Sequence, residues 1–135
     1  MMDAEALVRE FCDVLSRHDP GAVRPYLTDD AVYHNVGMAQ NVGADAVITD
    51  LTNQYGMFPD AYRFEIKHLA VNGPVVLTER IDYLEGPMMR MAIPVMGIFV
   101  VDGERISRWT DYFDSALIGK IVGGEDTTGL IPTAW

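Results

Sequence analysis

Apolar residues recur every three or four positions in two stretches of the chain, which is the spacing of an amphipathic helix. The first stretch covers residues 3–18, where Asp3 is placed to cap the first turn and Asp19-Pro-Gly ends the helix. The second covers residues 43–57, and a short helical turn is expected between them at residues 22–27. The two apolar stripes consist of Leu7, Phe11, Val14 and Leu15, and of Val47, Ile48, Leu51 and Tyr55.

Alternating and β-branched segments predict strands in the rest of the chain. A first strand is expected at residues 31–36, before the second helix, and four more at residues 62–71, 75–84, 89–101 and 104–113. Asn72-Gly73 and Asp102-Gly103 are typical of tight hairpins, so the last four strands form an antiparallel meander. This order predicts an α+β fold in which the helices cover one face of the sheet.

The Asp102-Gly103 loop also predicts a register for the last hairpin. It pairs Val101 with Glu104, which places Trp109 opposite Met96 and Asp111 opposite Pro94. Proline donates no ladder hydrogen bond, so a bulge or a sheet edge is expected near this carboxylate. Residues 115–135 read as a tail that packs back on the domain, through Leu117, Ile118, Ile121, Leu130, Ile131 and Trp135.

Length and charge narrow the class of protein. A chain of 135 residues predicts one domain over residues 1–135, large enough to enclose a small pocket. The formal net charge of −10 leaves no broad basic surface, so neither nucleic acid nor an anionic membrane is an expected partner. The N-terminus lacks a basic leader and no apolar run reaches a membrane span, which predicts a soluble, cytoplasmic protein.

Metal and thiol chemistry are not expected. The single cysteine, Cys12, lies in a helical pattern without a cysteine or histidine at ligand spacing, and is interpreted as a packed or surface thiol. The three histidines, His18, His34 and His68, are scattered along the chain. No cofactor is predicted.

Asp111 is the first candidate for chemistry, because two aromatic residues flank it at a spacing of two. In a strand, Trp109, Asp111 and Phe113 share one face, so the carboxylate points into an apolar space. A buried Asp is costly without a partner. Arg80 and Asp82 share a face of an earlier strand and offer that partner.

The patterns of the individual strands predict different faces of the sheet to be buried. Taken alone, residues 75–84 favour Arg80 and Asp82 as an exposed surface pair. Residues 104–113 favour burial of the carboxylate face, and residues 89–101 are apolar on both faces. Because the helices can cover only one side, we expect a ligand pocket on the concave face and a homodimer through the convex face.

Tyr33 and Asn35 repeat the spacing of two on the first strand, and by themselves they are typical of a packed tyrosine and a strand-ending asparagine. Read in order, Tyr33-His-Asn35, Glu79-Arg80-Ile-Asp82 and Trp109-Thr-Asp111-Tyr-Phe-Asp114 make residues 3–118 resemble the limonene-1,2-epoxide hydrolase family. The resemblance implies the cone-like fold of nuclear transport factor 2 and the SnoaL-type cyclases. In that fold, N-terminal helices cover the concave face of a curved, mixed, mainly antiparallel sheet.

The resemblance also implies roles for five residues. Asp111 would be the general base, with Tyr33 and Asn35 positioning one water. Asp82 would be the general acid, and Arg80 would bridge the two carboxylates. Opening an epoxide expels a basic alkoxide, so a base and an acid acting together suit this reaction. Counting charges, two ionised carboxyls and one guanidinium would leave a net negative charge in an apolar cavity, so one carboxyl should titrate well above its usual value.

The expected substrate is a hydrophobic epoxide, terpenoid or polyketide-derived, in an apolar pocket. The expected substrate-binding residues are Leu84, Trp109, Phe113 and Met96, with Met38, Met57 and Met88 as further wall residues or ordinary core.

Three other functions remain open. A same-fold isomerase or cyclase would need one base and oxyanion donors. An epoxide-opening cyclase would use a substrate hydroxyl in place of water. A non-catalytic binding or dimerisation module predicts that Asp82 and Asp111 do not reach one arginine.

Overall fold

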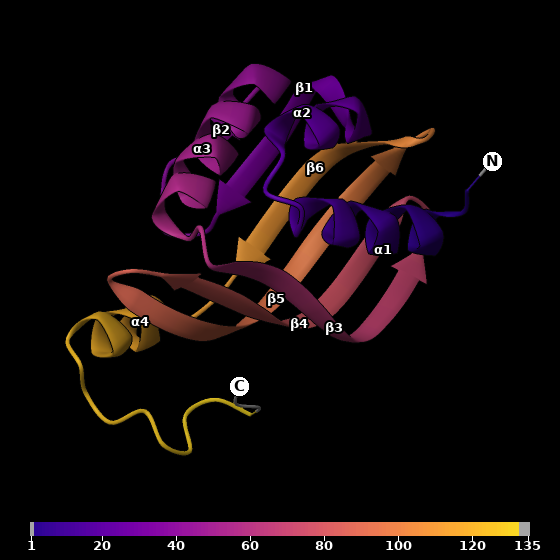
Figure 1. Cartoon of the computed structure of the whole chain (residues 1–135). Helices are drawn as coiled ribbons and strands as arrows, with labels where there is room; N and C mark the ends of the chain where they lie inside the picture. The colour runs from indigo at the N-terminus through magenta and orange to yellow at the C-terminus, as the bar shows by residue number, and fades with distance from the viewer. Residues whose placement is uncertain (1, 133–135) are drawn as a thin grey trace.

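The computed structural model describes residues 2–132. It consists of a curved six-stranded sheet with helices packed on one face (Figure 1). The helices are α1 (Ala4–Leu15), α2 (Pro20–Val23), α3 (Ala44–Met57) and α4 (Ser115–Val122), with a 3-10 turn η1 (Arg24–Tyr26). The strands are β1 (Leu27–Asn35), β2 (Asn41–Val42), β3 (Ala61–Asn72), β4 (Val75–Gly86), β5 (Met89–Asp102) and β6 (Arg105–Tyr112).

The strand order is β2-β1-β6-β5-β4-β3, and the pairing of β1 with β6 is parallel while the others are antiparallel. The predicted α+β class and the mixed, mainly antiparallel sheet are therefore confirmed. The parallel pairing brings the first strand of the chain next to the last, so that residues 33–35 and 109–111 lie side by side.

Local signals place most elements within a few residues. Asp3 caps α1 as expected, since its Oδ1 atom accepts a hydrogen bond from the Ala6 amide at 2.8 Å. The first strand begins at Leu27, earlier than expected, because it pairs with β6 there. The two-residue strand β2 was not expected, and α4 replaces the irregular start of the expected tail, with Asp114 as its N-cap.

The register predicted for the last hairpin is wrong. Asp102 pairs with Arg105, one residue beyond the expected turn, and the register shifts again between Val100 and Val101. The net displacement is an odd number of residues. Because side chains alternate between faces, an odd displacement exchanges the two faces of a strand.

This displacement corrects the neighbours of the candidate residues. Asp111 lies opposite Gly97 instead of Pro94, and Trp109 does not face Met96. Since β6 has already ended where Pro94 lies, β5 is locally unpaired on that side, as a residue without an N–H requires.

Helix α1 closes the concave face over β3 and β4 (Figure 1). Its Phe11 is fully buried and meets Trp109 and Phe99 with ring centroids 5.4 and 6.0 Å apart. Such edge-on contacts add to the free energy gained by burying the rings. The main core therefore lies directly beneath the strands that carry the candidate residues.

The convex face is covered in part by the chain's own C-terminal segment. Ile131 packs against Ile81, Tyr83 and Ala92 on that face. Leu77, Met96 and Tyr112 remain between 41% and 52% exposed. Dimerisation through this face stays a prediction, and Trp135 lies outside the described residues.

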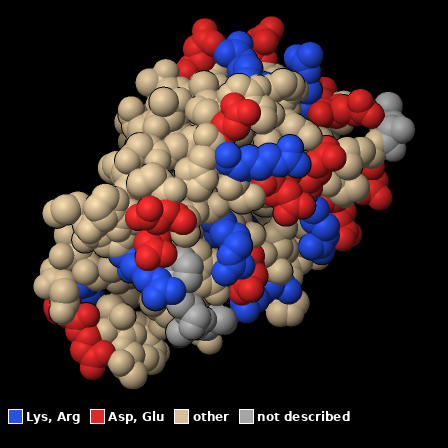
Figure 2. All heavy atoms as spheres, viewed as in Figure 1, with Lys and Arg blue, Asp and Glu red and all other residues tan. Residues whose placement is uncertain are grey.

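On the face seen in Figure 2, acidic and basic side chains are interspersed and form no extended basic area. Among residues 2–132, no helix is long and apolar enough to cross a membrane.

The burial of Phe11 gives a prediction for stability. Replacing Phe11 by alanine should lower the free energy of unfolding by about 3–5 kcal/mol, because the removed ring leaves a cavity between α1 and the sheet. Chemical denaturation measures this. The exposed Asp13 on the same helix is the control, and Asp13→Ala should change stability by less than about 0.5 kcal/mol. Equal effects of the two changes would contradict the assignment of α1 as the cover of the core.

Candidate active site

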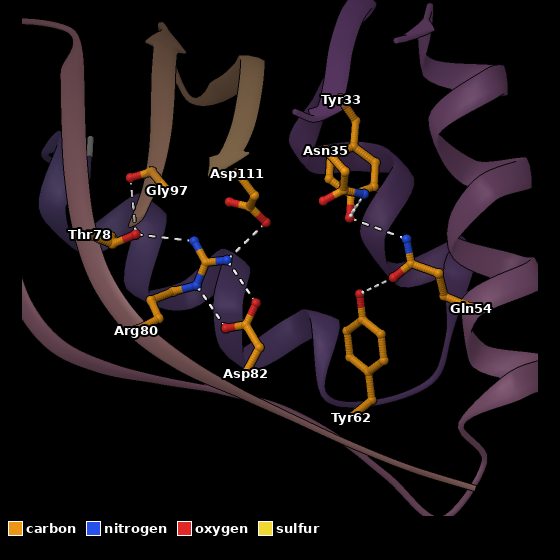
Figure 3. Close-up of polar contacts among 9 residues, drawn as sticks. All are labelled: Tyr33, Asn35, Gln54, Tyr62, Thr78, Arg80, Asp82, Gly97 and Asp111. Carbon is orange, nitrogen blue, oxygen red and sulfur yellow. Dashed lines mark hydrogen bonds and ion pairs between the residues drawn. The ribbon is translucent and has the colours of Figure 1, made fainter. Parts of the chain in front are cut away.

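Arg80, on β4, is the centre of the site and has no solvent exposure. Its Nε atom donates to Asp82 Oδ1 at 3.0 Å, and its Nη2 atom donates to Asp82 Oδ2 at 2.9 Å. The same Nη2 atom donates to Asp111 Oδ2 at 2.9 Å, as Figure 3 shows. One guanidinium thus joins two buried carboxyl groups from different strands, and Arg80 and Asp82 do not form a surface pair.

The contact between Arg80 and Asp111 passes over β5, which lies between β4 and β6. It is possible because the residue of β5 at the crossing is Gly97, directly opposite Asp111. A Cβ atom on Gly97 would lie 2.0 Å from Arg80 Nη1 and 2.6 Å from Asp111 Oδ1. The missing side chain of Gly97 therefore makes room for the bridge.

Thr78 supports the guanidinium from the remaining side. Its Oγ1 atom accepts from Arg80 Nη1 at 3.1 Å and donates to the Gly97 carbonyl at 3.1 Å. Sequence reasoning missed both Thr78 and Gly97. The available signals were the spacing of two between Thr78 and Arg80 and a glycine inside a strand, which often marks close approach.

Burial and charge together raise the pKa of one carboxyl group, which is the direction that the charge count predicts. Burial raises the pKa of Asp82 from 3.8 to about 6; Arg80 opposes this rise and the charge of Asp111 adds to it. Burial alone would lower the pKa of Arg80, but the charges of Asp111 and Asp82 outweigh it and hold that pKa well above its usual value. Arg80 therefore stays charged.

Tyr33 and Asn35 stand beside this group on β1. Asn35 is the parallel partner of Asp111, and its Nδ2 atom donates to the Tyr33 hydroxyl at 3.0 Å. Tyr33 is buried and stacks on Trp109 at a centroid distance of 3.8 Å. Within the described chain, the buried Oδ1 atom of Asp111 has no hydrogen-bond partner. A buried acceptor of this kind needs a partner, and a water can supply it.

A further polar group, not expected from the sequence, faces the bridge from α3 and β3. The Gln54 side chain donates from Nε2 to Tyr33 Oη at 3.2 Å and accepts from Tyr62 Oη at 2.8 Å. Figure 3 shows these residues and the Arg80 group on two sides of one space. The isolated glutamine in a helical pattern carried no signal, because only the fold brings it to Tyr33.

A cavity of about 360 Å³ lies between these two polar groups. Tyr33, Asn35, Gln54, Asp82 and Asp111 line it, and the rest of its wall is mainly apolar. The further lining residues are Met38, Asp50, Met57, Phe58, Tyr62, Phe64, Leu84, Met89, Met91, Ile93, Val95, Phe113, Ile118 and Val122.

Of the four expected substrate-binding residues, Leu84 and Phe113 line the cavity, whereas Met96 and Trp109 do not. Met96 lies on the convex face and is 52% exposed, because the shifted register turns the even positions of β5 away from the cavity. Trp109 does not line the cavity, since it is buried behind Tyr33 in the core. Met88 is 89% exposed and is not part of the cavity wall.

Within residues 2–132, neither a metal-binding cluster nor a reactive thiol accompanies this cavity. Among residues 2–132, no three His, Cys, Asp or Glu side chains are grouped to hold a metal ion. Burial raises the pKa of the Cys12 thiol to about 12, so it is an ordinary packed thiol rather than a nucleophile.

The fold places the chain in the class of cone-shaped α+β proteins that includes the SnoaL-like cyclases. The structure of a putative SnoaL-like polyketide cyclase from Shewanella denitrificans OS-217 superposes with a TM-score of 0.81 over 90% of this chain and 98% of that one. The sequence identity is 19%, so this likeness concerns the fold alone.

The family follows from closer matches. Residues 2–122 match the family described as limonene-1,2-epoxide hydrolase catalytic domain. Epoxide hydrolase EphG from Mycobacterium tuberculosis (strain ATCC 25618 / H37Rv) is 36% identical over 107 residues, 79% of this chain and 70% of that protein. The structure of an M. tuberculosis LEH-like epoxide hydrolase is 32% identical, with a TM-score of 0.80 and 96% coverage of both chains. The chain therefore belongs to the limonene-1,2-epoxide hydrolase family, a family of epoxide hydrolases.

The crossing over Gly97 gives a prediction. Gly97→Ala should lower the free energy of unfolding by about 1–3 kcal/mol, because the added methyl group overlaps Arg80 and displaces it from Asp111. Thermal or chemical unfolding measures the loss. In the control Gly56→Ala, on α3, a Cβ meets nothing within 4 Å and alanine favours the helix, so stability should be unchanged or higher. A Gly97→Ala protein as stable as the parent would show that the bridge does not need this gap.

Proposed function

We propose that the protein converts a hydrophobic epoxide to a vicinal diol in one step, with Asp111 as general base and Asp82 as general acid. The observation that carries the proposal is the single Nη2 atom of Arg80 that donates to both carboxyl groups at 2.9 Å. A planar guanidinium bound in this way holds base and acid at a constant separation on one wall of the cavity.

In the proposed reaction, Tyr33, Asn35 and Asp111 hold one water. Asp111 takes a proton from the water as its oxygen forms a bond to an epoxide carbon. The bond from that carbon to the ring oxygen breaks, and the proton of Asp82 passes to the ring oxygen. Once the diol has formed, Asp111 is protonated and Asp82 is ionised. Return of one proton from Asp111 to Asp82 restores the enzyme. Acid and base act together because the departing alkoxide is strongly basic.

Arg80 has an electrostatic role in this cycle. It stays positively charged, so it neutralises whichever carboxyl group is ionised before and after proton transfer. The triad of Arg80, Asp82 and Asp111 then carries no net charge when one of the two carboxyl groups is protonated. This agrees with the raised pKa of Asp82, which keeps a proton available in the apolar cavity.

The alternative functions fit the geometry less well. A binding module without catalysis predicts that the two carboxyl groups are apart, whereas both contact Arg80. An isomerase acting on an enolisable ketone needs one base and oxyanion donors, and gives no reason for a second carboxyl on the same guanidinium. An epoxide-opening cyclase would use the same acid and base with a substrate hydroxyl, so only the product distinguishes it.

The apolar wall supports a neutral, hydrophobic substrate. Leu84, Ile93 and Phe113 present hydrocarbon surface beside the carboxyl groups. A carboxylate on the substrate would be buried among Asp50, Asp82 and Asp111 with Arg80 already neutralised, which is unfavourable. Terpenoid or polyketide-derived epoxides meet this requirement.

Removal of the base tests the reaction. In ¹⁸O-labelled water, the parent protein should convert apolar epoxides to diols carrying one label, and Asp111→Asn should lower the rate roughly 10²–10⁴-fold, because the amide cannot accept the proton of water. Mass spectrometry of product and protein follows the label.

The matched control is Asp114→Asn. Asp114 caps α4 through its side chain, and asparagine is an equally good cap, so activity should stay within about twofold. Label found first in the protein would exclude one-step attack by water. A cyclic ether in place of the diol would favour the cyclase.

The raised pKa of Asp82 predicts a pH dependence. An acid whose pKa lies near 6 instead of 3.8 stays protonated over a wider range, and it loses the catalytic proton as the pH rises through about 6. The value of kcat/KM should therefore decrease above this pH, approaching about tenfold per unit. The decrease should be absent from the residual activity of Asp82→Asn. A profile that is flat between pH 5 and 8, or a decrease that persists in Asp82→Asn, would contradict the role of Asp82.

A further inference from the structure

Gln54 occupies a position in the cavity wall that the proposed reaction does not yet use. It lies one helical turn after Asp50 on α3, and its Nε2 atom donates to Asp50 Oδ2 at 2.8 Å and to Tyr33 Oη at 3.2 Å. Its Oε1 atom accepts from Tyr62 Oη at 2.8 Å. The side chain therefore links α3 with β1 and β3 (Figure 3).

The chemistry of its partners sets the direction of this amide. The carboxylate oxygen of Asp50 accepts a hydrogen bond here, so the nitrogen of Gln54 faces it. The Tyr62 hydroxyl then donates to the oxygen on the other side. One N–H of Gln54 remains, and it is directed at Tyr33.

The Tyr33 hydroxyl consequently accepts two hydrogen bonds, from Gln54 and from Asn35. A phenolic oxygen has acceptor capacity for these two and one proton of its own to donate. Neither amide N–H can receive that proton. It must point away from both, and Figure 3 shows the hydroxyl beside the space that separates it from Asp111.

We propose that Gln54 is a positioning residue, which forces Tyr33 to act as a hydrogen-bond donor to the attacking water. The inference rests on the proposed function and adds the orientation of the water to it. The water accepts from Tyr33 and donates to Asp111 and to Asn35 Oδ1, since the Asn35 nitrogen is occupied by Tyr33. Both water protons and one lone pair are then used, and the second lone pair is left for the epoxide carbon.

Without the N–H of Gln54, Tyr33 could accept from the water instead of donating to it. The water would then lose a proton position that Asp111 requires. Gln54 acts only through the Tyr33 hydroxyl, whereas a residue that merely fills the wall would affect turnover whether or not this hydroxyl is present. The two roles therefore differ in how the effects of Gln54 and Tyr33 combine.

A double-mutant cycle on the full chain tests this difference, with kcat and KM measured for an apolar epoxide that the parent protein hydrolyses. Gln54→Met keeps length and helix preference and removes the amide. It should lower kcat about tenfold with KM within twofold, the loss that one oriented hydrogen bond explains. In the Tyr33→Phe background the same change should lower kcat by less than about twofold.

Gln54→Glu provides a second, isosteric variant. A carboxylate at this position accepts from Tyr33 and turns its proton away from the water, so kcat should decrease more than in Gln54→Met. A role in packing alone predicts the opposite order, because glutamate preserves the shape. Asn53→Leu, on the exposed side of α3, is the control for the helix and should leave kcat within twofold. Thermal unfolding of each variant confirms a folded protein.

The inference is overturned if Gln54→Met lowers kcat by the same factor with and without the Tyr33 hydroxyl, or if it has no effect in the parent protein. In either case Asp111→Asn, assayed beside it, would still show the loss of rate predicted above, and the proposed function would stand. A parent protein that hydrolyses no epoxide would overturn both.

Discussion

The burial of one positive charge, on Arg80, is the constraint on which the arrangement of the site depends. An unpaired guanidinium in a protein interior is strongly unfavourable, so its surroundings must supply charge and hydrogen-bond acceptors. Asp82 supplies them from the same strand and Asp111 from across β5, while Thr78 accepts from the remaining nitrogen. This requirement also determines the residue on β5, because only a glycine at position 97 leaves room for Arg80 to reach Asp111. What stabilises the buried arginine also sets the distance between two carboxyl groups.

The same arrangement gives two chemically identical side chains different environments. Asp82 receives two hydrogen bonds from Arg80, yet burial and the charge of Asp111 still raise its pKa. Asp111 receives one hydrogen bond from Arg80 and keeps a buried oxygen without a partner in the described chain. The proposed reaction assigns the acid to the carboxyl group with the raised pKa and the base to the one with a free acceptor oxygen. Their environments, and not their residue type, therefore distinguish them.

The sequence was sufficient for what depends on local patterns and insufficient for what depends on register. The spacings of two at Tyr33/Asn35 and Arg80/Asp82 placed each pair on one face of a strand, and the structure agrees. Asp111 and Phe113 both line the cavity, although β6 ends at Tyr112. The bulge at Ser107 of β6, opposite the step from Val100 to Val101, was not predicted, because a bulge leaves no clear residue signature. Its effect was to exchange the faces of β5, and this misplaced Met96 and concealed Gly97. Gln54 could not be found by pattern, since its partners lie on two distant strands.

The cavity wall combines side chains from the sheet with side chains from the helices α3 and α4. The bridge and Tyr33 project from β1, β4 and β6, and Trp109, held by Phe11 of α1, stacks beneath Tyr33. These side chains are fixed by the sheet and its main core. The outer wall includes Met57 of α3 together with Ile118 and Val122 of α4, and α4 packs on β5. Substitution of these wall residues would reshape the space offered to a substrate without removing a hydrogen bond of Arg80. Gln54 is the exception, because it lies on a wall helix and yet contacts Tyr33. In the role proposed for Gln54, a shift of α3 would alter the orientation of the attacking water together with the shape of the cavity, and this one side chain would couple substrate choice to turnover.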